Sequence, residues 1–521
     1  MNAQRPLNAT HAARAGKSTV DADDPRYDQL LQRNFNKRFV ARPALIQLVD
    51  SSEHVMQAVQ DAVQRGLRVV ARSGGCCLEG FVADPAVRVV IDTLLMTDVS
   101  YDPELEAIAI EPGVTLGEVY QKLFLGWGVT LPAGQSPYIG MGGHVMGGGH
   151  SFLSRQHGML VDHLYAVEVV CVDEAGRAHR VVATREPTDP NRELWWAHTG
   201  AGGGNFGIVT RYWFRSPGPT KSGDALVSLP QAPGSVTSFK AEWQWKDMNE
   251  LAVKRLIANY GDWCEANSGA DSPFTTLYGV LTLGRPACGG KIEARGMVVA
   301  GADSERLLDE HLRAINDGVR VEPTRELEHS SWLDFAVNPW PEVFATQAGG
   351  VASSKAMLKL KDAFLRKRHS DRQLAALYDH LVNGPSDIGG GVGLATFGGR
   401  VNAVAHDATA YVHRDSTLST SYSVGWQKPE DEARSLAWLR KFYGELFAET
   451  GGVPVPGEVN NGATINHPDV DLADPEWNRS GVPWHDLYFK NNYPRLQRAK
   501  ARWDPRDVFH HALSIRLPPS E

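Results

Sequence analysis

The stretch "ARSGGCCLEGF", residues 71–81, decides the fold of this chain. It follows the apolar run "GLRVV" at 66–70, so a strand leads into a turn with two glycines and two adjacent cysteines. Glycine can adopt positive φ and bring backbone N–H groups against a bound phosphate. The stretch therefore predicts a loop that closely approaches a ligand, with the thiols of Cys76 and Cys77 beside it.

The segments around this loop alternate between helical and strand patterns. Residues 51–66 have helical periodicity after a serine cap, and residues 115–128 have the same pattern. Strands are expected in the β-branched and aromatic runs, at 87–95, 106–113, 162–176 and 207–217. These elements predict an α+β half that ends near Pro217, where "SPGPTKSG" indicates a boundary.

The second half of the chain repeats the mixed pattern without repeating the sequence. Strands are expected at 274–284 and 290–301, and a helix at 304–316. We find no internal repeat and no low-complexity tract. The second half is therefore predicted to be another α+β domain.

The composition narrows the classes of protein that this chain can be. A chain of 521 residues is too long for one ordinary hydrophobic core. The net charge of −8, without a run of basic residues, argues against nucleic-acid binding. No apolar run is long enough to span a membrane, and the first 20 residues lack the apolar core of a signal peptide. The five cysteines form neither a zinc-ligand spacing nor a disulfide framework. We expect a cytoplasmic protein without a metal site.

Two further segments are rich in glycine, "PAGQSPYIGMGGHVMGGGH" at 132–150 and "TGAGGGNFG" at 199–207. Each alone is a weak signal, because most isolated glycine runs are plain turns. The first does not match the dinucleotide fingerprint of a parallel β-α-β unit, since neither the glycine spacing nor a following acidic residue fits.

Taken in order with "LYFKNNYPRLQRAKARWDPRDVFHHALSI" at 487–515, these segments form a known pattern. From about Asn34 to Pro518 the chain resembles the FAD-linked oxidases of the vanillyl-alcohol-oxidase superfamily. The resemblance is strongest to the berberine-bridge-enzyme-like branch, particularly bacterial enzymes that tailor natural products.

The resemblance implies an α+β fold with four parts. Residues 1–33 are expected to be a disordered or extended lead. Residues 34–215 are expected to form a PCMH-type FAD-binding domain of two subdomains. Residues 216–475 are expected to form the α+β substrate domain with a large antiparallel sheet, and residues 476–521 to return to the FAD-binding domain.

The resemblance and the glycine-rich loops together suggest which residues bind FAD. The diphosphate would be held by the first loop and its preceding arginine, and the second loop would lie along the flavin and its ribityl chain. Asp162 would orient cofactor groups or be structural, and Ile208 would contact the adenine end. The expected cofactor residues are Arg72, Ser73, Gly74, Gly75, Cys76, Cys77, Ser136, Gly140, Gly142, Gly143, His144, Gly148, Gly149, Asp162, Ile208, Tyr488 and Asn492.

The chain departs from the family at both positions that bond covalently to flavin. Cys76 stands where many relatives have a histidine, and Ser136 stands where bicovalent relatives have a cysteine. A serine is not expected to form that second bond. Three states of Cys76 remain open: an inert thiol beside noncovalent FAD, which is favoured, an 8α-S-cysteinyl link, or a strained disulfide with Cys77.

A third departure concerns the catalytic base. Relatives often have a Y-x-N-Y motif whose second tyrosine takes a proton, but this chain has Thr464 and His467 at the two tyrosine positions. Imidazole titrates near neutral pH without a large pKa shift, so His467 is the candidate base. The alternative is that His467 is only a polar residue at the rim. Tyr488 is a second candidate beside the flavin, with a role in positioning favoured.

These residues predict an FAD-dependent oxidase or dehydrogenase acting on a small molecule, with a secondary metabolite as the expected class. His467 would take a proton, flavin N5 would accept hydride, and dioxygen would reoxidise the flavin. Two other classes remain open: a redox-neutral cyclase, dehydratase or isomerase that uses His467, and a catalytically idle flavin-binding protein. The sequence predicts no oligomeric state.

Overall fold

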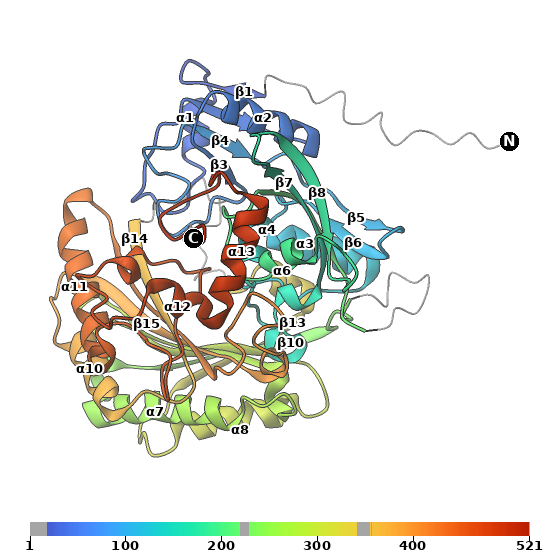
Figure 1. Cartoon of the computed structure of the whole chain (residues 1–521). Helices are drawn as coiled ribbons and strands as arrows, with labels where there is room; N and C mark the ends of the chain where they lie inside the picture. The colour runs from blue at the N-terminus through green and yellow to red at the C-terminus, as the bar shows by residue number, and fades with distance from the viewer. Residues whose placement is uncertain (1–17, 219–228, 341–354, 356, 520–521) are drawn as a thin grey trace.

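The structure is a computed structural model that describes residues 18–218, 229–340, 355 and 357–519. Within these residues the strands form sheets of four, five and seven strands. The two smaller sheets lie in the upper half of Figure 1 and the seven-stranded sheet lies below them. The combination of helices with parallel and antiparallel strands confirms the predicted α+β class.

The four-stranded sheet contains the strand that leads into the cysteine-bearing loop. Helix α2 (Ser52–Gln64) is capped by Ser51, whose hydroxyl accepts from the N–H of His54, and it packs Val55 and Val59 into the core of this sheet. The helix predicted at 51–66, the strand predicted to lead into the first loop and the strand predicted at 87–95 are therefore confirmed. The strand order is β1 (Thr19–Val20), β2 (Leu45–Leu48), β4 (Val89–Asp92), β3 (Val69–Arg72), with β2, β4 and β3 parallel.

The region before residue 34 contains regular structure. Strand β1 pairs with β2, and helix α1 (Tyr27–Leu31) buries Tyr27 and Leu30 together with Val20. The expectation of a disordered or extended lead is therefore wrong for residues 18–33, because these apolar side chains complete a small core. Residues 1–17 lie outside the described part.

The five-stranded antiparallel sheet separates two cores. Along β7, Val167, Val169 and Cys171 face the main core, whereas Val170 and Val172 face the core under α2. This explains the continuous apolar run "AVEVVCV", because alternate residues are buried on opposite faces. The order is β5 (Val99–Asp102), β6 (Ala107–Ile110), β9 (Ile208–Phe214), β7 (Leu164–Val172), β8 (Ala178–Thr184).

The second glycine-rich segment contains a helix. Residues Met141–Met146 form α4, which begins after Gly140, and Ser154–His157 form α5. The sequence predicted a loop throughout 132–150, and this was wrong for α4. Buried Met141 and Val145 stabilise the helix by packing, which outweighs the low helix propensity of glycine.

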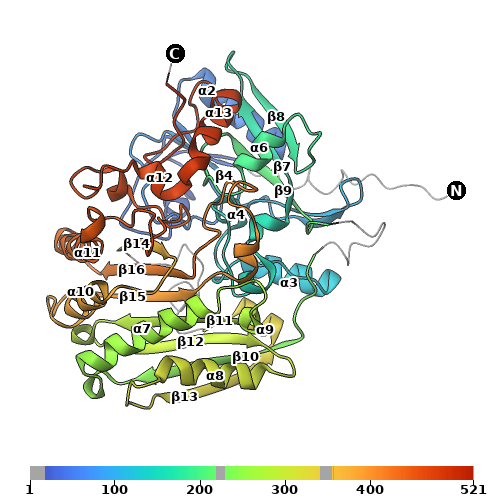
Figure 2. The ribbon, with the colours of Figure 1, turned by 60° about the horizontal axis from the view of Figure 1, so that its bottom comes forward.

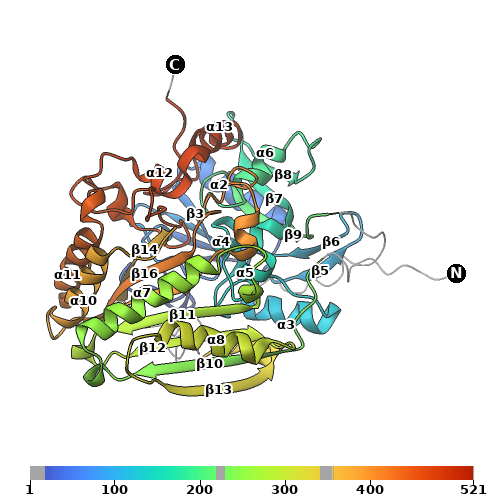
Figure 3. The same ribbon diagram turned by 90° about the horizontal axis from the view of Figure 1, so that it is seen from below.

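The seven-stranded sheet is antiparallel and has helices on its outer face. Figures 2 and 3 show α7 (Glu250–Ala266) and α8 (Ser304–Asn316) lying across it, with α10 (Asp371–Val382) and α11 (Glu432–Leu446) beside them. The strands predicted at 274–284 and 290–301 and the helix at 304–316 are confirmed. The order is β13 (Thr324–Ser331), β10 (Ser235–Trp243), β12 (Ile292–Val299), β11 (Leu277–Gly284), β15 (Gly389–Thr396), β16 (Leu418–Trp426), β14 (Met357–Leu365).

The C-terminal segment lies against the two smaller sheets. After α12 (Trp484–Phe489), helix α13 (Tyr493–Trp503) packs on α6 (Arg192–Ala197), and Arg495 pairs with Glu193 at 2.6 Å. Figure 1 shows α13 in red between these elements and α12. No helix in the described ranges has the length and apolarity needed to cross a membrane.

Candidate functional site

Two glycine-rich loops touch each other through their backbones. An added Cβ on Gly74 would lie 2.3 Å from the backbone nitrogen of Gly140, and one on Gly140 would lie 2.4 Å from that of Gly74. The N–H of Gly142 also donates to Ser73 Oγ at 3.3 Å. Any side chain at either contact glycine would push the loops apart, which explains the residue choice.

The third glycine-rich segment and the segment containing His467 join this contact. The N–H of Gly202 donates to the carbonyl of Met146 at 2.8 Å. Asn466 Nδ2 donates to the carbonyl of His144 at 3.2 Å, which ties the candidate base to α4. Segments that are far apart in sequence therefore meet around α4.

The first loop has the donors that a diphosphate needs. None of the backbone N–H groups of residues 74–78 donates to a protein acceptor within the described ranges. Buried N–H groups require partners, and a row of them in a turn is a common anion site. Arg72 is buried behind this row and lies 2.7 Å from Asp92. The loop therefore fits the diphosphate of FAD.

The imidazoles of His144, His150 and His467 lie close enough to interact electrostatically. All three side chains are half-buried, and Gly143 beside them is exposed. Burial nevertheless lowers the pKa of His144 and His467 to about 4 and that of His150 to about 3. The accessible surface of these three rings and the open surroundings of Gly143, where an added Cβ would meet nothing within 4 Å, mark what we call the internal space. All three rings are neutral at pH 7.

The hydrogen bonds of these rings differ. His144 Nε2 donates to the carbonyl of Ala133 at 2.5 Å, so its Nδ1 has a lone pair, and this atom is not buried. Gln135 Nε2 donates to Nδ1 of His150 at 3.3 Å. His467 Nδ1 is buried and has no hydrogen-bond partner among the described residues, whereas its Nε2 is not buried. His467 therefore presents Nε2 to the internal space.

The two loop cysteines are free thiols. Burial raises the pKa of Cys76 to about 12 and that of Cys77 to about 11. Cys76 Sγ lies 3.8 Å from the carbonyl oxygen of Gly74 and 3.9 Å from that of Tyr138. The disulfide alternative is therefore wrong for this structure, and at neutral pH both residues are protonated thiols rather than nucleophilic thiolates.

Three other predicted residues have protein partners. Asp162 is bound by Arg414, with the nearest oxygen 2.6 Å from Nη2, and Asn492 Nδ2 donates to the carbonyl of His406 at 3.0 Å. Tyr488 Oη accepts from the N–H of Asp469 at 2.9 Å. These contacts order the three side chains, and Asp162 also lines the separate cavity at the end of α5 that is described below. Ile208 is buried at the start of β9, Ser136 is buried in the second loop, and Gly148 and Gly149 follow α4 with positive φ.

Sequence reasoning missed a buried row of alternating charges beside the site. Lys359 contacts Glu79 and lies 2.7 Å from Asp469. Lys361 lies 2.6 Å from Asp469 and 2.7 Å from Asp471. Arg440 completes the row at 2.8 Å from Asp471. We call these six residues the ion ladder. It joins the cysteine-bearing loop, β14 and the segment after His467.

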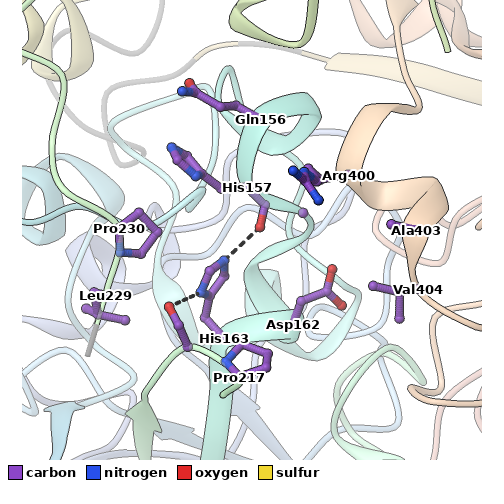
Figure 4. Close-up of a pocket in the computed structure, with 12 residues that line it drawn as sticks. Gln156, His157, Asp162, His163, Pro217, Leu229, Pro230, Arg400, Ala403 and Val404 are labelled. Carbon is purple, nitrogen blue, oxygen red and sulfur yellow. Dashed lines mark hydrogen bonds between the residues drawn. The ribbon is translucent and has the colours of Figure 1, made fainter. Parts of the chain in front are cut away.

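A separate cavity of about 480 Å³ lies at the end of α5. Figure 4 shows that His163 lines this cavity and is hydrogen-bonded to Ser216 and to the carbonyl of His157. Arg400 also lines the cavity. This cavity contains neither His467 nor Tyr488. Neither in this cavity nor elsewhere in the described chain is a group of three or more His, Cys, Asp or Glu arranged to hold a metal ion.

Comparisons with known proteins identify the family. The family model described as "FAD binding domain" matches residues 43–181, and "Berberine and berberine like" matches residues 463–516. The aclacinomycin-N/aclacinomycin-A oxidase of Streptomyces galilaeus is 49% identical over 507 residues, which covers 97% of this chain and 91% of the relative. This chain belongs to the berberine-bridge-enzyme-like family. It is an FAD-dependent oxidoreductase.

Solved structures of berberine-bridge-enzyme-like proteins support this assignment. A glycopeptide hexose oxidase complexed with teicoplanin has a TM-score of 0.91 and 47% identity, covering 96% of this chain and 99% of that one. Aclacinomycin oxidoreductase has a TM-score of 0.91 and 48% identity, covering 96% and 100%. The resemblance seen in the sequence and the PCMH-type fold that it implied are both confirmed.

Proposed function

We propose that this protein is an oxidase of a secondary metabolite, with FAD held noncovalently and His467 as the base. The observations that carry the proposal are the neutral imidazole of His467, whose Nε2 is not buried, and the first loop, whose N–H groups at 74–78 have no protein acceptor in the described ranges. Two similar proteins, an aclacinomycin oxidase and a glycopeptide hexose oxidase, support a natural product as the substrate.

Each residue of the site has a separate task in this proposal. Bound FAD supplies the two-electron acceptor chemistry. The N–H groups of residues 74–78 bind its diphosphate, and His144 accepts from a cofactor hydroxyl through Nδ1. His467 Nε2 takes the substrate proton, and the surrounding protein excludes bulk water from the imidazoles. Tyr488 and Asn492 order the walls of the site.

The other predicted cofactor contacts are proposed on position alone. Arg72 and Asp162 contribute to FAD binding through their ion-pair partners, and the remaining glycines allow close approach of the backbone to the cofactor.

Dioxygen is the proposed final acceptor of electrons, with hydrogen peroxide as its product. Consumption of oxygen matched by release of peroxide tests this part. The cytoplasmic setting stays a prediction.

The state of FAD attachment gives a direct test. Because Cys76 is a protonated thiol and Ser136 replaces the second attachment residue, acid precipitation should release all yellow FAD into the supernatant. The intact mass of the protein should equal that of the bare chain. A mass increase of one FAD that disappears in Cys76→Ser would instead establish a thioether.

A redox-neutral reaction is the second candidate, because three neutral imidazoles in one space can move protons without net oxidation. Anaerobic mixing with substrate separates the two candidates. We expect the flavin absorbance to bleach as product forms. Product without bleaching would favour the cyclase, dehydratase or isomerase, and neither signal with any natural-product candidate would favour an idle flavin-binding protein.

A further inference from the structure

A segment near the N-terminus wraps the outside of the cysteine-bearing loop. We call residues 33–37 the N-terminal strap. Arg33 Nη2 donates to the carbonyl of Ser73 at 3.0 Å, and the N–H of Phe35 donates to the carbonyl of Gly75 at 2.8 Å. These bonds fix two loop carbonyls on the side that faces the strap.

Asn36 anchors the N-terminal strap at its centre. This side chain is 1% exposed, and its Nδ2 donates to the carbonyl of Leu78 at 2.8 Å and to that of Leu358 at 3.0 Å. Its Oδ1 accepts from the N–H of Leu358 at 3.3 Å. Asn36 thus binds the end of the loop and strand β14 together.

The backbone carbonyls of the loop are therefore bound by the strap, whereas its backbone N–H groups are not. The strap binds the carbonyls of Ser73, Gly75 and Leu78, whereas the N–H groups of residues 74–78 have no protein acceptor in the described ranges. Holding a carbonyl on one side of a turn directs the adjacent N–H toward the other side. The strap prepares the loop for an anion.

The same region has more positive than negative charge. Asp92, which is fully buried, is contacted by both Arg33 and Arg72. Burial and the Arg33 guanidinium lower the pKa of Arg72, although Asp92 opposes this, and burial and Arg72 lower the pKa of Lys37. Arg33 and Arg72 thus share one carboxylate, and Lys37, whose Nζ donates to the carbonyls of Gln32 and Asn34, adds a third positive charge close to Arg72. An anion bound at the loop would complement this charge.

We propose that the N-terminal strap is a diphosphate-binding element that retains FAD where no covalent bond does so. Arg33 and the N–H of Phe35 position the N–H groups of the loop, and Asn36 holds the end of the loop on β14. Arg33 and Lys37 supply charge that complements the diphosphate. The inference rests on the proposed noncovalent binding of FAD. It assigns cofactor binding to Arg33, which was expected in the disordered or extended lead, and to the first residues of the expected FAD-binding domain.

Cofactor titrations of the apoprotein test this role. The variants are Arg33→Gln and Lys37→Gln, and the matched control is Arg42→Gln, which removes a cation that is exposed and paired with Asp28. All are made in a Cys76→Ser background, so that the result does not depend on covalent attachment. The ligands are FAD, ADP and riboflavin, of which only riboflavin lacks the diphosphate.

We expect the Kd for FAD and for ADP to rise about tenfold in Arg33→Gln and about threefold in Lys37→Gln, with riboflavin binding unchanged. Added salt should narrow the difference between Lys37→Gln and the control. If Arg33→Gln does not fold, Lys37→Gln decides, because Lys37 makes no bond to Asp92.

Two outcomes would overturn the inference. One is that both variants bind FAD and ADP as tightly as Arg42→Gln. The other is that riboflavin binding falls by the same factor as FAD binding, which would show general damage to the site. The acid-release experiment on the unaltered protein reports separately on the proposed function, so the two failures can be distinguished.

Discussion

The His467→Ala variant is expected to fold, to bind FAD and to lose turnover by about 100-fold or more. His467 presents an unburied Nε2 to the internal space, and no hydrogen bond from the described part of the chain occupies that atom. Removing the ring removes the proposed proton acceptor but leaves the diphosphate loop unchanged. Steady-state kcat and KM, with FAD content measured on the same sample, check this result.

The pH dependence of the unaltered enzyme gives a second readout of the same residue. Burial lowers the pKa of His467 from 6.5 to about 4, so the neutral, proton-accepting form persists down to that pH. Activity that requires this form is present above about pH 4 and is lost as the pH falls through it. We therefore expect the acid limb of kcat/KM near pH 4 rather than near 6.5.

His157→Ala is the matched control for His467→Ala. His157 is also half-buried with a pKa lowered to about 4, but it lines the separate cavity of Figure 4. Its variant should retain full turnover. Near-normal turnover in His467→Ala would remove the base assignment, and a loss confined to His144→Ala would transfer that role to His144.

The sequence was most informative where local chemistry determines the structure. The glycines at 74 and 140 predicted close approach of the backbone to a ligand. The structure shows that the same glycines let the two loops touch each other, with an added Cβ on either lying within 2.4 Å of the other. The serine cap of α2 and the alternating strands could also be predicted, because caps and alternation are short-range patterns. The family resemblance then supplied the order of the domains.

Contacts between distant residues could not be predicted in this way. Asn36 lies 322 positions from Leu358, and Lys359 lies 280 positions from Glu79. No periodicity links such pairs, and the N-terminal strap has no helical or strand pattern of its own. The strap and the ion ladder therefore became visible only in the structure.

The properties of the imidazoles were also beyond the sequence. An unperturbed pKa near 6.5 was expected to suit His467 as a base without tuning. Burial lowers that pKa to about 4, which keeps His467 neutral but makes it a weaker base. Residue type alone does not reveal burial, since the same residue on the surface would titrate normally.

The Lys359→Met variant is expected to lower the free energy of unfolding by about 3–5 kcal/mol. Lys359 is paired with Glu79 and Asp469, and these three side chains are 1–2% exposed. Burial alone would lower the pKa of Lys359, but the carboxylates of Asp469, Glu79 and Asp471 raise it above its usual value. Methionine fills a similar volume but leaves Glu79 without its partner. Denaturant unfolding of the apoprotein measures the change.

Lys367→Met is the control, because Lys367 pairs with Glu458 at the surface and its loss should leave the unfolding midpoint unchanged. The double variant Glu79→Leu/Lys359→Met should recover much of the stability, since the loss comes from an unpaired buried charge rather than from the missing lysine itself. Equal stability of Lys359→Met and the unaltered protein would refute this account.

The ion ladder also predicts how stability depends on acid. Arg440, Lys361 and Lys359 hold the pKa of Asp471 well below its usual value of 3.8, although burial opposes them. A carboxyl whose pKa is lower in the folded state contributes stability above its unfolded pKa and loses it as the pH falls further. The unaltered protein should therefore lose stability steeply below about pH 4, and Asp471→Asn should flatten that part of the curve. An identical acid limb in Asp471→Asn would show that other carboxyl groups cause the loss, and the ion ladder would then have no measurable part in acid unfolding.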